Sequence, residues 1–531
     1  MVLRGGARGR IVSEVELKLL LEKQQIPAVI ARIEQLPQAM RKVHAGRLLR
    51  SIYFDTPARI LRKNGISIRL RRDGKRWLQT VKLNGSIAGG LSKVTEIEQP
   101  ALNGGISIDA IKNGAVRGEI EKLVSATPLQ TVAETHIHRT RVDLCLEGGA
   151  KAELAVDSGA IKAAGRSEPL NELEIELVEG HPADLYKTAR LLLPDGAVRF
   201  SRFSKAARGF LLAQRGHIEP PAKPRKAKSV PLNRKDAPSD AARGILRECL
   251  AQIAENIEAV RRCDDIEGPH QLRIGLRRLR VALALFTCEF DPASAEKFKK
   301  EARWLGREVG RLRDLDVVLH DIAQPFFSEG DRSHGAAPVL GTLQRHTDDV
   351  RADLRHLLSG ERVNNFLLDL SELAETGIRE GSSTKSRSAA GRKLKDLARA
   401  KLEKRWNHVI TSAKGIDAFT LERKHRLRKE LKKLRYTIEF FAPLYTPRSV
   451  KRMTEKLKTL QTVFGSLNDA AVADQILSKP PLSSINDLAA QRAIGRLVGS
   501  CETRAIHDWP AAKIDWKAVK TCPPFWKQVR K

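Results

Sequence analysis

The sequence predicts a multidomain α+β protein with a strand-rich N-terminal part and an all-helical C-terminal part. With 531 residues, the chain is too long for one ordinary hydrophobic core. Near residue 217 the pattern changes from short segments of alternating polarity to long segments with apolar residues every three to four positions. The helical part also repeats itself, which predicts a duplicated helical bundle.

Period-two alternation of apolar and polar residues predicts the strands of the N-terminal part. The clearest strand segments are 13–21, 65–72, 152–157 and 172–177. Turn sequences separate them, notably 72–75 and 147–149. Helical periodicity is confined to two places, around residues 26–36 and 182–193.

Two loose stretches divide the chain. Residues 217–237 are rich in Pro and Lys and lack periodicity, which predicts an extended linker after a strand-rich domain of residues 10–215. The helical domain then covers 238–525. A Ser- and Gly-rich stretch, 377–391, splits it into two repeats, expected at about 238–376 and 392–525.

The two repeats share a pattern in which a histidine is followed by basic residues three, seven and ten positions later. The residues are His270, Arg273, Arg277 and Arg280 in the first copy and His425, Arg428, Lys432 and Arg435 in the second. A second motif, Gly310–Asp314, recurs as Gly465–Asp469 at the same offset of 155 residues. Two motifs at one offset indicate duplication of a whole helical unit.

These basic residues fall on one face of each predicted helix, where they form a stripe of positive charge. A solvated basic surface is the ordinary interpretation of one such helix, but repetition of the histidine and the spacing favours a binding site. The net charge of +32 also predicts an anionic partner. With only 5% aromatic residues, the chain has few platforms for stacking nucleic-acid bases.

The predicted strands carry charged residues of one sign, or of a fixed mixture, on one face. In 13–21, Glu14, Glu16 and Lys18 alternate with apolar residues. Similar rows occur in later segments: Arg69 and Arg71, Glu96 and Glu98, Arg139 and Arg141, and Glu172, Glu174 and Glu176. Each row alone fits a solvated surface. If the strands close into a barrel, the rows together form a charged lumen whose carboxylates suit Mg²⁺ or Mn²⁺ and whose cations suit phosphate.

The segment Glu14–Lys18 resembles the ExExK signature of the CYTH superfamily, the triphosphate tunnel metalloenzymes. The resemblance spans roughly residues 10–215 in the family's order. It continues through Tyr53–Pro57, Arg69 and Arg71, Lys82, Glu96 and Glu98, Asp157, Glu172–Glu176 and Ser204–Lys205. The resemblance implies an eight-stranded antiparallel β tunnel that hydrolyses a triphosphate with Mg²⁺ or Mn²⁺.

By the same resemblance, particular residues receive roles. The implied metal ligands are Glu14, Glu16, Asp157, Glu174 and Glu176. The implied phosphate-binding residues are Lys18, Arg69, Arg71, Lys82, Lys205 and one or both of Arg139 and Arg141. Glu14, Glu16 and Lys18 form the implied catalytic set, and Glu96, Glu98 and Glu172 are further acidic tunnel residues. The family often has an arginine where this chain has Val94, and Lys93 is the nearest basic residue.

The helical half resembles the CHAD domain through residues 270–280 and the Leu-Arg-Asp and Leu-Asn-Asp corners at 312–314 and 467–469. This resemblance covers roughly 238–525 and implies a basic cleft that binds inorganic polyphosphate. Although the family name refers to chelation, two histidines among so many cations are poor metal ligands. We therefore favour a polyanion site formed by the eight stripe residues.

The leading hypothesis is a metal-dependent inorganic triphosphatase, acting on tripolyphosphate, whose helical domain binds polyphosphate. Two alternatives stay open: hydrolysis or cyclisation of an organic triphosphate, and a non-enzymatic protein that binds polyphosphate or polyphosphate granules. The six cysteines form no CxxC pair, and the N-terminus has no apolar export signal, so we expect a cytoplasmic protein. We expect no membrane partner and no specific nucleic-acid partner. The sequence leaves the oligomeric state open.

Overall fold

The computed structural model describes residues 11–37, 40–101, 104–124, 127–194, 198–329, 335–378 and 393–527. The chain separates into two compact units. The barrel unit comprises residues 1–221 and 359–376, and the helical unit comprises 222–358 and 377–531. The N-terminal decapeptide, and most of the predicted loose stretch 377–391, lie outside the described residues.

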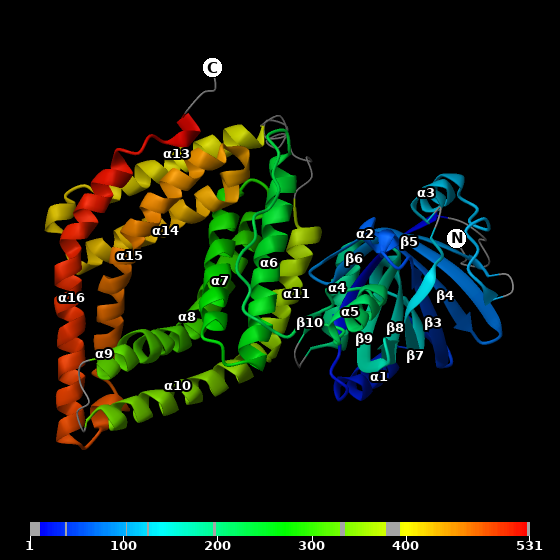
Figure 1. Cartoon of the computed structure of the whole chain (residues 1–531), viewed down its shortest axis with the longest axis horizontal. Coiled ribbons are helices and arrows are strands. Elements are labelled where there is room, and N and C mark those ends of the chain that lie inside the picture. Colours follow the sequence, from blue (N-terminus) through cyan, green and yellow to red (C-terminus); the bar gives the residue numbers. More distant parts are fainter. Residues whose placement is uncertain are drawn as a thin grey trace. The chain divides into compact units, whose positions relative to one another are not determined.

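Eight antiparallel strands of the described residues close into a barrel (Figure 1). Around the barrel they follow the order β1, β6, β5, β4, β3, β7, β8, β9 and back to β1. Their bounds are β1 Ile11–Leu20, β3 Arg47–Asp55, β4 Ile66–Asp73, β5 Arg76–Ala88, β6 Leu91–Pro100, β7 Gln130–Cys145, β8 Lys151–Ala163 and β9 Arg166–Glu179. Two short strands, β2 (Arg41–Val43) and β10 (Arg199–Phe200), pair with β7 and β1. The predicted eight-stranded tunnel is confirmed.

The barrel has an apolar outer face and a charged inner face. Outward residues of β1, β7, β8 and β9, such as Leu17, Leu154 and Ile175, are fully buried in one cluster. Helices α1 (Gln25–Gln35), α4 (Pro182–Leu192) and α11 (Glu361–Glu375) contribute side chains to this cluster. A second cluster joins β4, β5 and β6 to α2 (Ile60–Lys63) and α3 (Gly114–Val124). Burial of the outer face under helices leaves the inner face for the charged rows.

Helix α5 (Lys205–Arg215) closes part of the lumen at the end where β1 finishes. Inward-facing apolar residues there pack against Leu212 of α5: Leu20, Ile137, Ile161 and Leu170. The approach is close, since a Cβ added to Gly209 of α5 would lie 2.4 Å from the Cβ of Ala133. The charged rows therefore end in an apolar layer that fixes α5, and Lys205 at the start of this helix reaches the charged interior.

The two predicted helices of the N-terminal part are confirmed as α1 and α4. Helices α3 and α5 were not predicted, because each contains glycines within a short apolar pattern, a composition that weakens the helical signal. Helix α11 lies in the sequence region predicted as the first helical repeat, yet it belongs to the barrel unit. The predicted domain boundaries otherwise remain a prediction.

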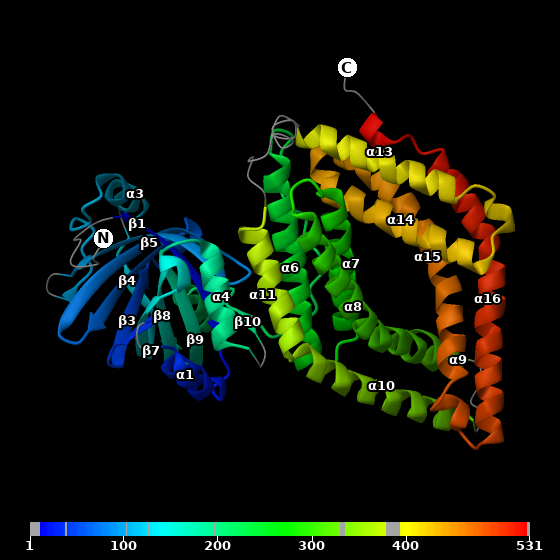
Figure 2. The same cartoon turned by 180° about the vertical axis from the view of Figure 1, so that it is seen from behind.

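The helical unit contains the expected duplication (Figures 1 and 2). In the first copy, three successive helices are α6 (Pro238–Arg262), α7 (Glu267–Leu285) and α8 (Pro292–Asp316). Their counterparts are α13 (Leu394–Ser412), α14 (Leu421–Phe441) and α15 (Pro447–Leu477). The starts differ by 156, 154 and 155 residues, close to the offset found in the sequence motifs.

The two copies differ after the third helix. A π-helical segment, Val317–Ala323, and α9 (Gln324–Glu329) follow α8, whereas α15 continues without such a break. Helices α10 (Ala336–Leu358) and α16 (Leu488–Lys520) come next in the two copies. None of the described helices is long and apolar enough to cross a lipid bilayer.

The linker 217–237 has no regular helix or strand, and two of its charged residues, Glu219 and Arg225, form ion pairs outside it. Glu219 accepts ion pairs from Arg208 at 2.9 Å and Arg199 at 3.1 Å in the barrel unit. Arg225 pairs with Glu248 at 2.8 Å in the helical unit. The Pro- and Lys-rich composition therefore describes an extended segment whose charges are used locally.

We predict that Gly90→Ala lowers the free energy of unfolding of the barrel unit more than Gly74→Ala does. Both glycines have positive φ, 80° and 62°, so each alanine introduces strain of about 1–2 kcal/mol. At Gly90 the new Cβ would lie 2.7 Å from the Phe200 ring and 2.9 Å from the carbonyl oxygen of Lys18, whereas at Gly74 it meets nothing within 4 Å. Overpacking should add about 1–3 kcal/mol at Gly90. Urea unfolding of both full-length variants measures the difference, and equal losses would contradict it.

Candidate functional site

The barrel contains a cavity of about 1470 Å³ whose lining includes many charged side chains of both signs. The predicted residues that line it are Glu14, Glu16, Lys18, Arg69, Arg71, Lys82, Glu96, Glu98, Arg139, Arg141, Glu174, Glu176 and Lys205. Asp157 and Glu172 are 0% and 1% exposed and are not among the lining residues. The closed barrel thus brings together rows that extend from Glu14 to Glu176, 162 positions apart in the sequence.

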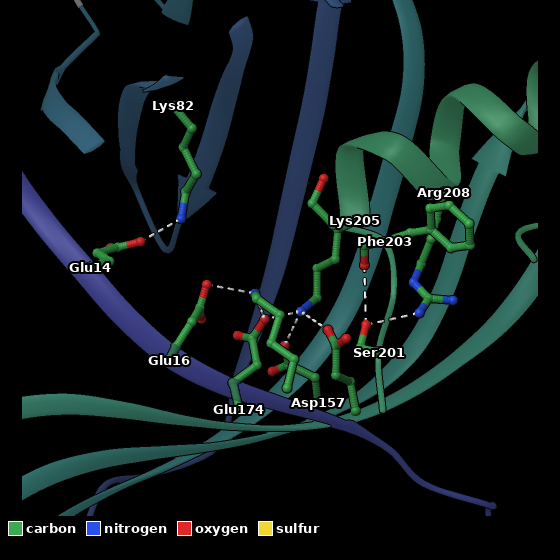
Figure 3. A network of polar contacts seen from close by, with 12 residues as sticks. Glu14, Glu16, Lys82, Asp157, Glu174, Ser201, Phe203, Lys205 and Arg208 are labelled. Carbon is green, nitrogen blue, oxygen red and sulfur yellow. Dashed lines mark hydrogen bonds and ion pairs between the residues drawn. The ribbon is translucent and has the colours of Figure 1, made fainter. Parts of the chain in front are cut away.

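Glu174 is the centre of the densest ion-pair network (Figure 3). Its Oε1 accepts from Lys18 Nζ at 2.6 Å and from Lys205 Nζ at 2.7 Å, and its Oε2 accepts from Arg139 at 2.6 Å. Burial alone would raise the pKa of Glu174, but the cations of Lys18, Lys205 and Arg139 outweigh burial and hold the pKa well below its usual value. Glu174 therefore stays ionised in the barrel.

Asp157 and Glu172 complete this network from below the cavity surface. Asp157 receives two hydrogen bonds from Arg139, at 2.7 and 2.6 Å, and lies 2.9 Å from Lys205 Nζ. Glu172 accepts from the same ammonium at 2.6 Å. Burial favours the neutral form of Asp157, yet Arg139 and Lys205 lower its pKa. Because three carboxylates share the two cations, Arg139 and Lys205 are held in fixed positions.

A second network links β1, β5 and β6. Lys82 Nζ lies 2.7 Å from Glu14 Oε2 and 2.5 Å from Glu96 Oε2. Burial, together with the neighbouring carboxylates of Glu96, Glu176 and Glu16, raises the pKa of Glu14 to about 7 despite the opposing effect of Lys82. Negative charge is therefore in excess on this side of the cavity. A bound cation would relieve the excess.

Positive charge is in excess on the neighbouring side. Among the described residues no ion pair is formed by Arg71, and its buried Nε has no hydrogen-bond partner. Burial and the nearby guanidinium groups of Arg69 and Arg139 lower the pKa of Arg71. Arg69 has only a distant ion pair, 3.9 Å from Glu96, and its Nε is also unpartnered. Burial opposes the charge of Arg69, but Glu96 and other carboxylates raise its pKa, so Arg71 is the less compensated of the two. A buried guanidinium group without an ion pair is costly, so the surroundings of Arg71 are suited to an anionic ligand.

The donor set fits a hard divalent cation. Glu14, Glu16 and Glu176 line the cavity, and Glu16 and Glu176 are directly paired in the register of β1 and β9. Carboxylate oxygens are the ligands that Mg²⁺ and Mn²⁺ prefer. In the described parts of the chain, no three His, Cys, Asp or Glu side chains converge into a ready metal site. The carboxylates instead hold ammonium groups, as in the 2.8 Å pair between Lys18 and Glu16, which a cation would have to replace.

The remaining tunnel residues lie toward the end of the barrel at which β1 begins. Arg141 is exposed and pairs with Glu153 at 3.0 Å, whereas Arg139 is committed to the Glu174 network. Glu98 accepts from the hydroxyl of Thr80 at 3.2 Å. Lys93 cannot replace the arginine missing at Val94, since Val94 lines the cavity while Lys93 pairs with Glu375 of α11 at 3.5 Å.

Several cavity-lining residues were not predicted from the sequence. Glu153 shares the inner face of β8 with Asp157, four positions away, and period-two spacing alone would have identified it. Arg47, Arg76 and Arg202 also line the cavity. They lie at strand ends or in a loop, where no periodicity assigns a side chain to a face.

In the helical unit, the two basic stripes lie on α7 and α14, which pack against each other. Burial lowers the pKa of Lys432 to about 6, assisted by Arg277, Arg428, Arg273 and Arg435. Charges from both helices therefore converge on this ammonium. Arg273 donates to Asp314 at 2.6 Å, and Asp469 opposes the lowering of the Arg428 pKa, so the acidic corners of both repeats face the stripes.

The other stripe residues lie around this centre. Burial lowers the pKa of His270, with Arg313, Lys432 and Arg273 adding to the effect. Burial also lowers the pKa of His425, assisted by Lys429, Arg428 and Lys432. The outermost members have separate surroundings: Arg280 is near Arg303, and Arg435 binds Gln461 at 2.9 Å and Glu439 at 3.2 Å.

Comparison with known proteins assigns both parts of the chain. Residues 13–210 match the model of the CYTH domain, and residues 244–478 match that of the CHAD domain. The inorganic triphosphatase of Haemophilus influenzae is 31% identical over 210 residues, which are 39% of this chain and 56% of that protein. The chain thus spans little more than half the length of this relative.

Other similarities extend over the helical unit. An uncharacterized protein of Mycobacterium tuberculosis is 27% identical over 493 residues, which are 86% of this chain and 85% of that protein. The crystal structure of the CHAD domain from the plant Ricinus communis is 26% identical, covers 57% of this chain and 99% of that chain, and superposes with a TM-score of 0.48. The chain contains a CYTH domain followed by a CHAD domain.

Proposed function

We propose that the barrel hydrolyses inorganic tripolyphosphate with Mg²⁺ or Mn²⁺. The observation that carries this proposal is the charge imbalance of the cavity: among the described residues Arg71 forms no ion pair, while Glu14 is crowded by other carboxylates. A complex of a divalent cation with a triphosphate would compensate both at once. The CYTH match and the 31% identity to an inorganic triphosphatase support the same activity.

In this proposal, carboxylate side chains bind the metal ion and cationic side chains bind the phosphate groups. Glu14, Glu16 and Glu176 would bind the divalent metal ion. Glu174 and Asp157 would hold the neighbouring lysine and arginine side chains in place. Lys18, Arg69, Arg71, Lys82 and Lys205 would bind phosphate oxygens and neutralise charge on the phosphoryl group as water attacks it. When bound, the divalent cation supplies further neutralisation and lowers the pKa of the attacking water. Positioning and charge complementarity therefore account for the proposed chemistry without a covalent intermediate.

Arg71→Ala should lower kcat/KM for tripolyphosphate on the order of 10²-fold, because the variant removes an unpaired donor from the phosphate side of the cavity. Arg72→Ala is the matched control, since Arg72 is exposed and donates only to the carbonyl of Gly74. Phosphate release by the full chain with Mg²⁺ or Mn²⁺ measures both. Equal losses in the two variants would contradict a role of Arg71 in binding.

The same assay defines the substrate and the metal requirement. Tripolyphosphate, thiamine triphosphate and ATP are compared, and turnover should disappear with EDTA and in Glu14→Ala/Glu16→Ala. If an organic triphosphate is turned over faster than tripolyphosphate, the organic compound becomes the proposed substrate in its place. No metal-dependent turnover of any of the three would overturn the enzymatic proposal and favour a protein that only binds polyphosphate.

We also propose that the helical unit binds inorganic polyphosphate through the facing stripes of α7 and α14. Arg273, Arg277, Arg428 and Lys432 gather positive charge from two helices, and the pKa of Lys432 is lowered first by burial and then by repulsion from these arginines. A linear chain of phosphates would relieve that repulsion along the length of both stripes. His270 and His425 would add to the site when protonated.

Arg428→Ala should weaken polyphosphate binding by about tenfold or more, the effect of removing one charge-assisted hydrogen bond. Arg426 lies two positions away on the same helix and is exposed, so Arg426→Ala is the matched control. Titration of each full-length variant with polyphosphate measures the dissociation constant. Equal binding by wild type, Arg428→Ala and Arg273→Ala/Arg277→Ala would exclude the stripes as the site.

Polyphosphate affinity should fall as pH rises above about 6. The ammonium of Lys432 loses its proton near pH 6 in the free protein, and a bound polyanion raises this pKa, so binding takes up a proton above pH 6. Because one proton is taken up on binding, the affinity for polyphosphate should fall by at most about tenfold per pH unit. Dissociation constants at pH 6–9 and constant ionic strength test this. Lys432→Arg, which stays charged, should flatten the dependence, and an unchanged slope in that variant would contradict the prediction.

A further inference from the structure

We infer that Asn364 and Ser371 of α11 are positioning residues for Lys18 in the barrel. Both lie in the half of the sequence that otherwise forms the helical unit, and neither belongs to the cavity wall. The inference rests on the proposed function of the barrel, in which Lys18 binds phosphate. Two hydrogen-bond paths lead from α11 and meet at the backbone of Lys18.

One face of α11 is buried in the barrel unit. Asn364, Leu368, Ser371 and Glu375 follow one another at helical spacing and are 1%, 0%, 0% and 7% exposed. Leu368 belongs to the apolar cluster on the outer face of the barrel. Arg190 of α4 forms ion pairs with Asp369, at 2.7 Å, and with Glu372. Apolar burial and ion pairing together fix the helix along its length.

The first path runs through the turn between β5 and β6. The hydroxyl of Ser371 donates to the carbonyl of Gly89 at 2.9 Å and lies 2.9 Å from the hydroxyl of Tyr186. The next residue, Gly90, accepts from the backbone N–H of Lys18 at 2.9 Å. Gly89 and Gly90 have φ of 54° and 80°, which is typical of a tight two-residue turn. A movement of Gly89 would therefore also move Gly90 and the Lys18 backbone bound to it.

The second path runs through β10. The Oδ1 atom of Asn364 accepts from the backbone N–H of Val198 at 3.0 Å. Three residues later, the backbone N–H of Ser201 donates to the carbonyl of Lys18 at 3.0 Å. Both backbone polar groups of Lys18 are thus bound by segments that α11 anchors. A shift of either segment would move Lys18, whose Nζ must reach Glu16 and Glu174 at 2.8 and 2.6 Å.

The internal repeat indicates that α11 has a use of its own. At the offset of 155, α11 corresponds to residues 516–530 of the second copy. In the described part of that segment, which ends at residue 527, the chain finishes α16 and forms a single 3₁₀ turn, Phe525–Lys527. The counterpart of the first five residues of α11 is thus still helical, whereas the counterpart of its later part, which includes Ser371, is not a continuous helix. The contacts of α11 with the turn and with β10 account for its presence in the first copy.

Hydrogen exchange of the full chain tests the contacts without reference to catalysis. Asn364→Ala and Ser371→Ala should speed amide exchange at residues 16–20, together with 198–201 and 88–92 respectively, by about tenfold or more, the effect of losing a buried hydrogen bond. Asn365→Ala is the matched control, because the Asn365 side chain reaches only Glu361 at 3.5 Å. Exchange at 66–83 should stay unchanged in all three, which separates a local change from global unfolding.

A conservative variant guards against misfolding as the explanation. Asn364→Asp has the same shape as asparagine, and because burial favours the neutral carboxyl group, it keeps an uncharged acceptor for Val198 at mildly acidic pH, where all variants are compared. The amide nitrogen that it removes has no hydrogen-bond partner among the described residues. Asn364→Asp should therefore restore the slow exchange that Asn364→Ala loses. Equal exchange at residues 16–20 in Asn364→Ala and Asn365→Ala would overturn the inference, whatever the barrel hydrolyses.

Kinetics then test whether the support acts through Lys18. Asn364→Ala should lower kcat/KM for tripolyphosphate by about tenfold, because a small misplacement of a phosphate-binding group is costly. In a Lys18→Ala background the same substitution should have no further effect. Additive losses would show that Asn364 acts elsewhere. A wild type without turnover would refute the proposed function, and the exchange experiment would still decide whether α11 orders Lys18.

Discussion

The carboxylate of Glu174, shared by Lys18, Lys205 and Arg139, is the interaction on which the barrel interior depends. Isolated charges could not be buried there, since the loss of hydration exceeds what one ion pair returns. The three cations come from β1, α5 and β7, so the shared carboxylate also fixes where these elements meet. Apolar residues beyond the charged layer then pack on Leu212 of α5 and close that end.

The charges that this network does not balance define what the cavity can accept. Glu14 has a raised pKa among other carboxylates, and within the described part of the chain Arg71 forms no ion pair and lies near two other guanidinium groups. The barrel thus holds an excess of each sign on separate walls of one cavity. A ligand that is itself a cation bound to a polyanion matches both walls. The helical unit shows the simpler case, in which burial and the facing stripes of one sign together lower the pKa of Lys432.

Duplication has given the helical unit its symmetric basic centre, and departures from the repeat mark specialised segments. Helices α6, α7 and α8 have counterparts at nearly constant offset, and both acidic corners face the stripes. Helix α11 departs from that pattern and is built into the barrel unit. The two compact units of this chain are therefore not separated at a single point of the sequence. A helix belongs to the unit against which its apolar face is buried.

The sequence by itself determined the period-two charged rows, the duplicated helices and the inner face of β1, because these follow from local spacing of side chains. It also identified Arg71, Lys82 and Glu174 through their rows and the family resemblance. Only the tertiary structure decided that Asp157 lies beneath the cavity surface, that Arg139 and Arg141 have different partners, and that α11 belongs to the barrel unit. Which charges pair, and which are left over, depends on the closure of β1 onto β9 and on α5, contacts between residues far apart in the chain. Local spacing carries no information about such contacts.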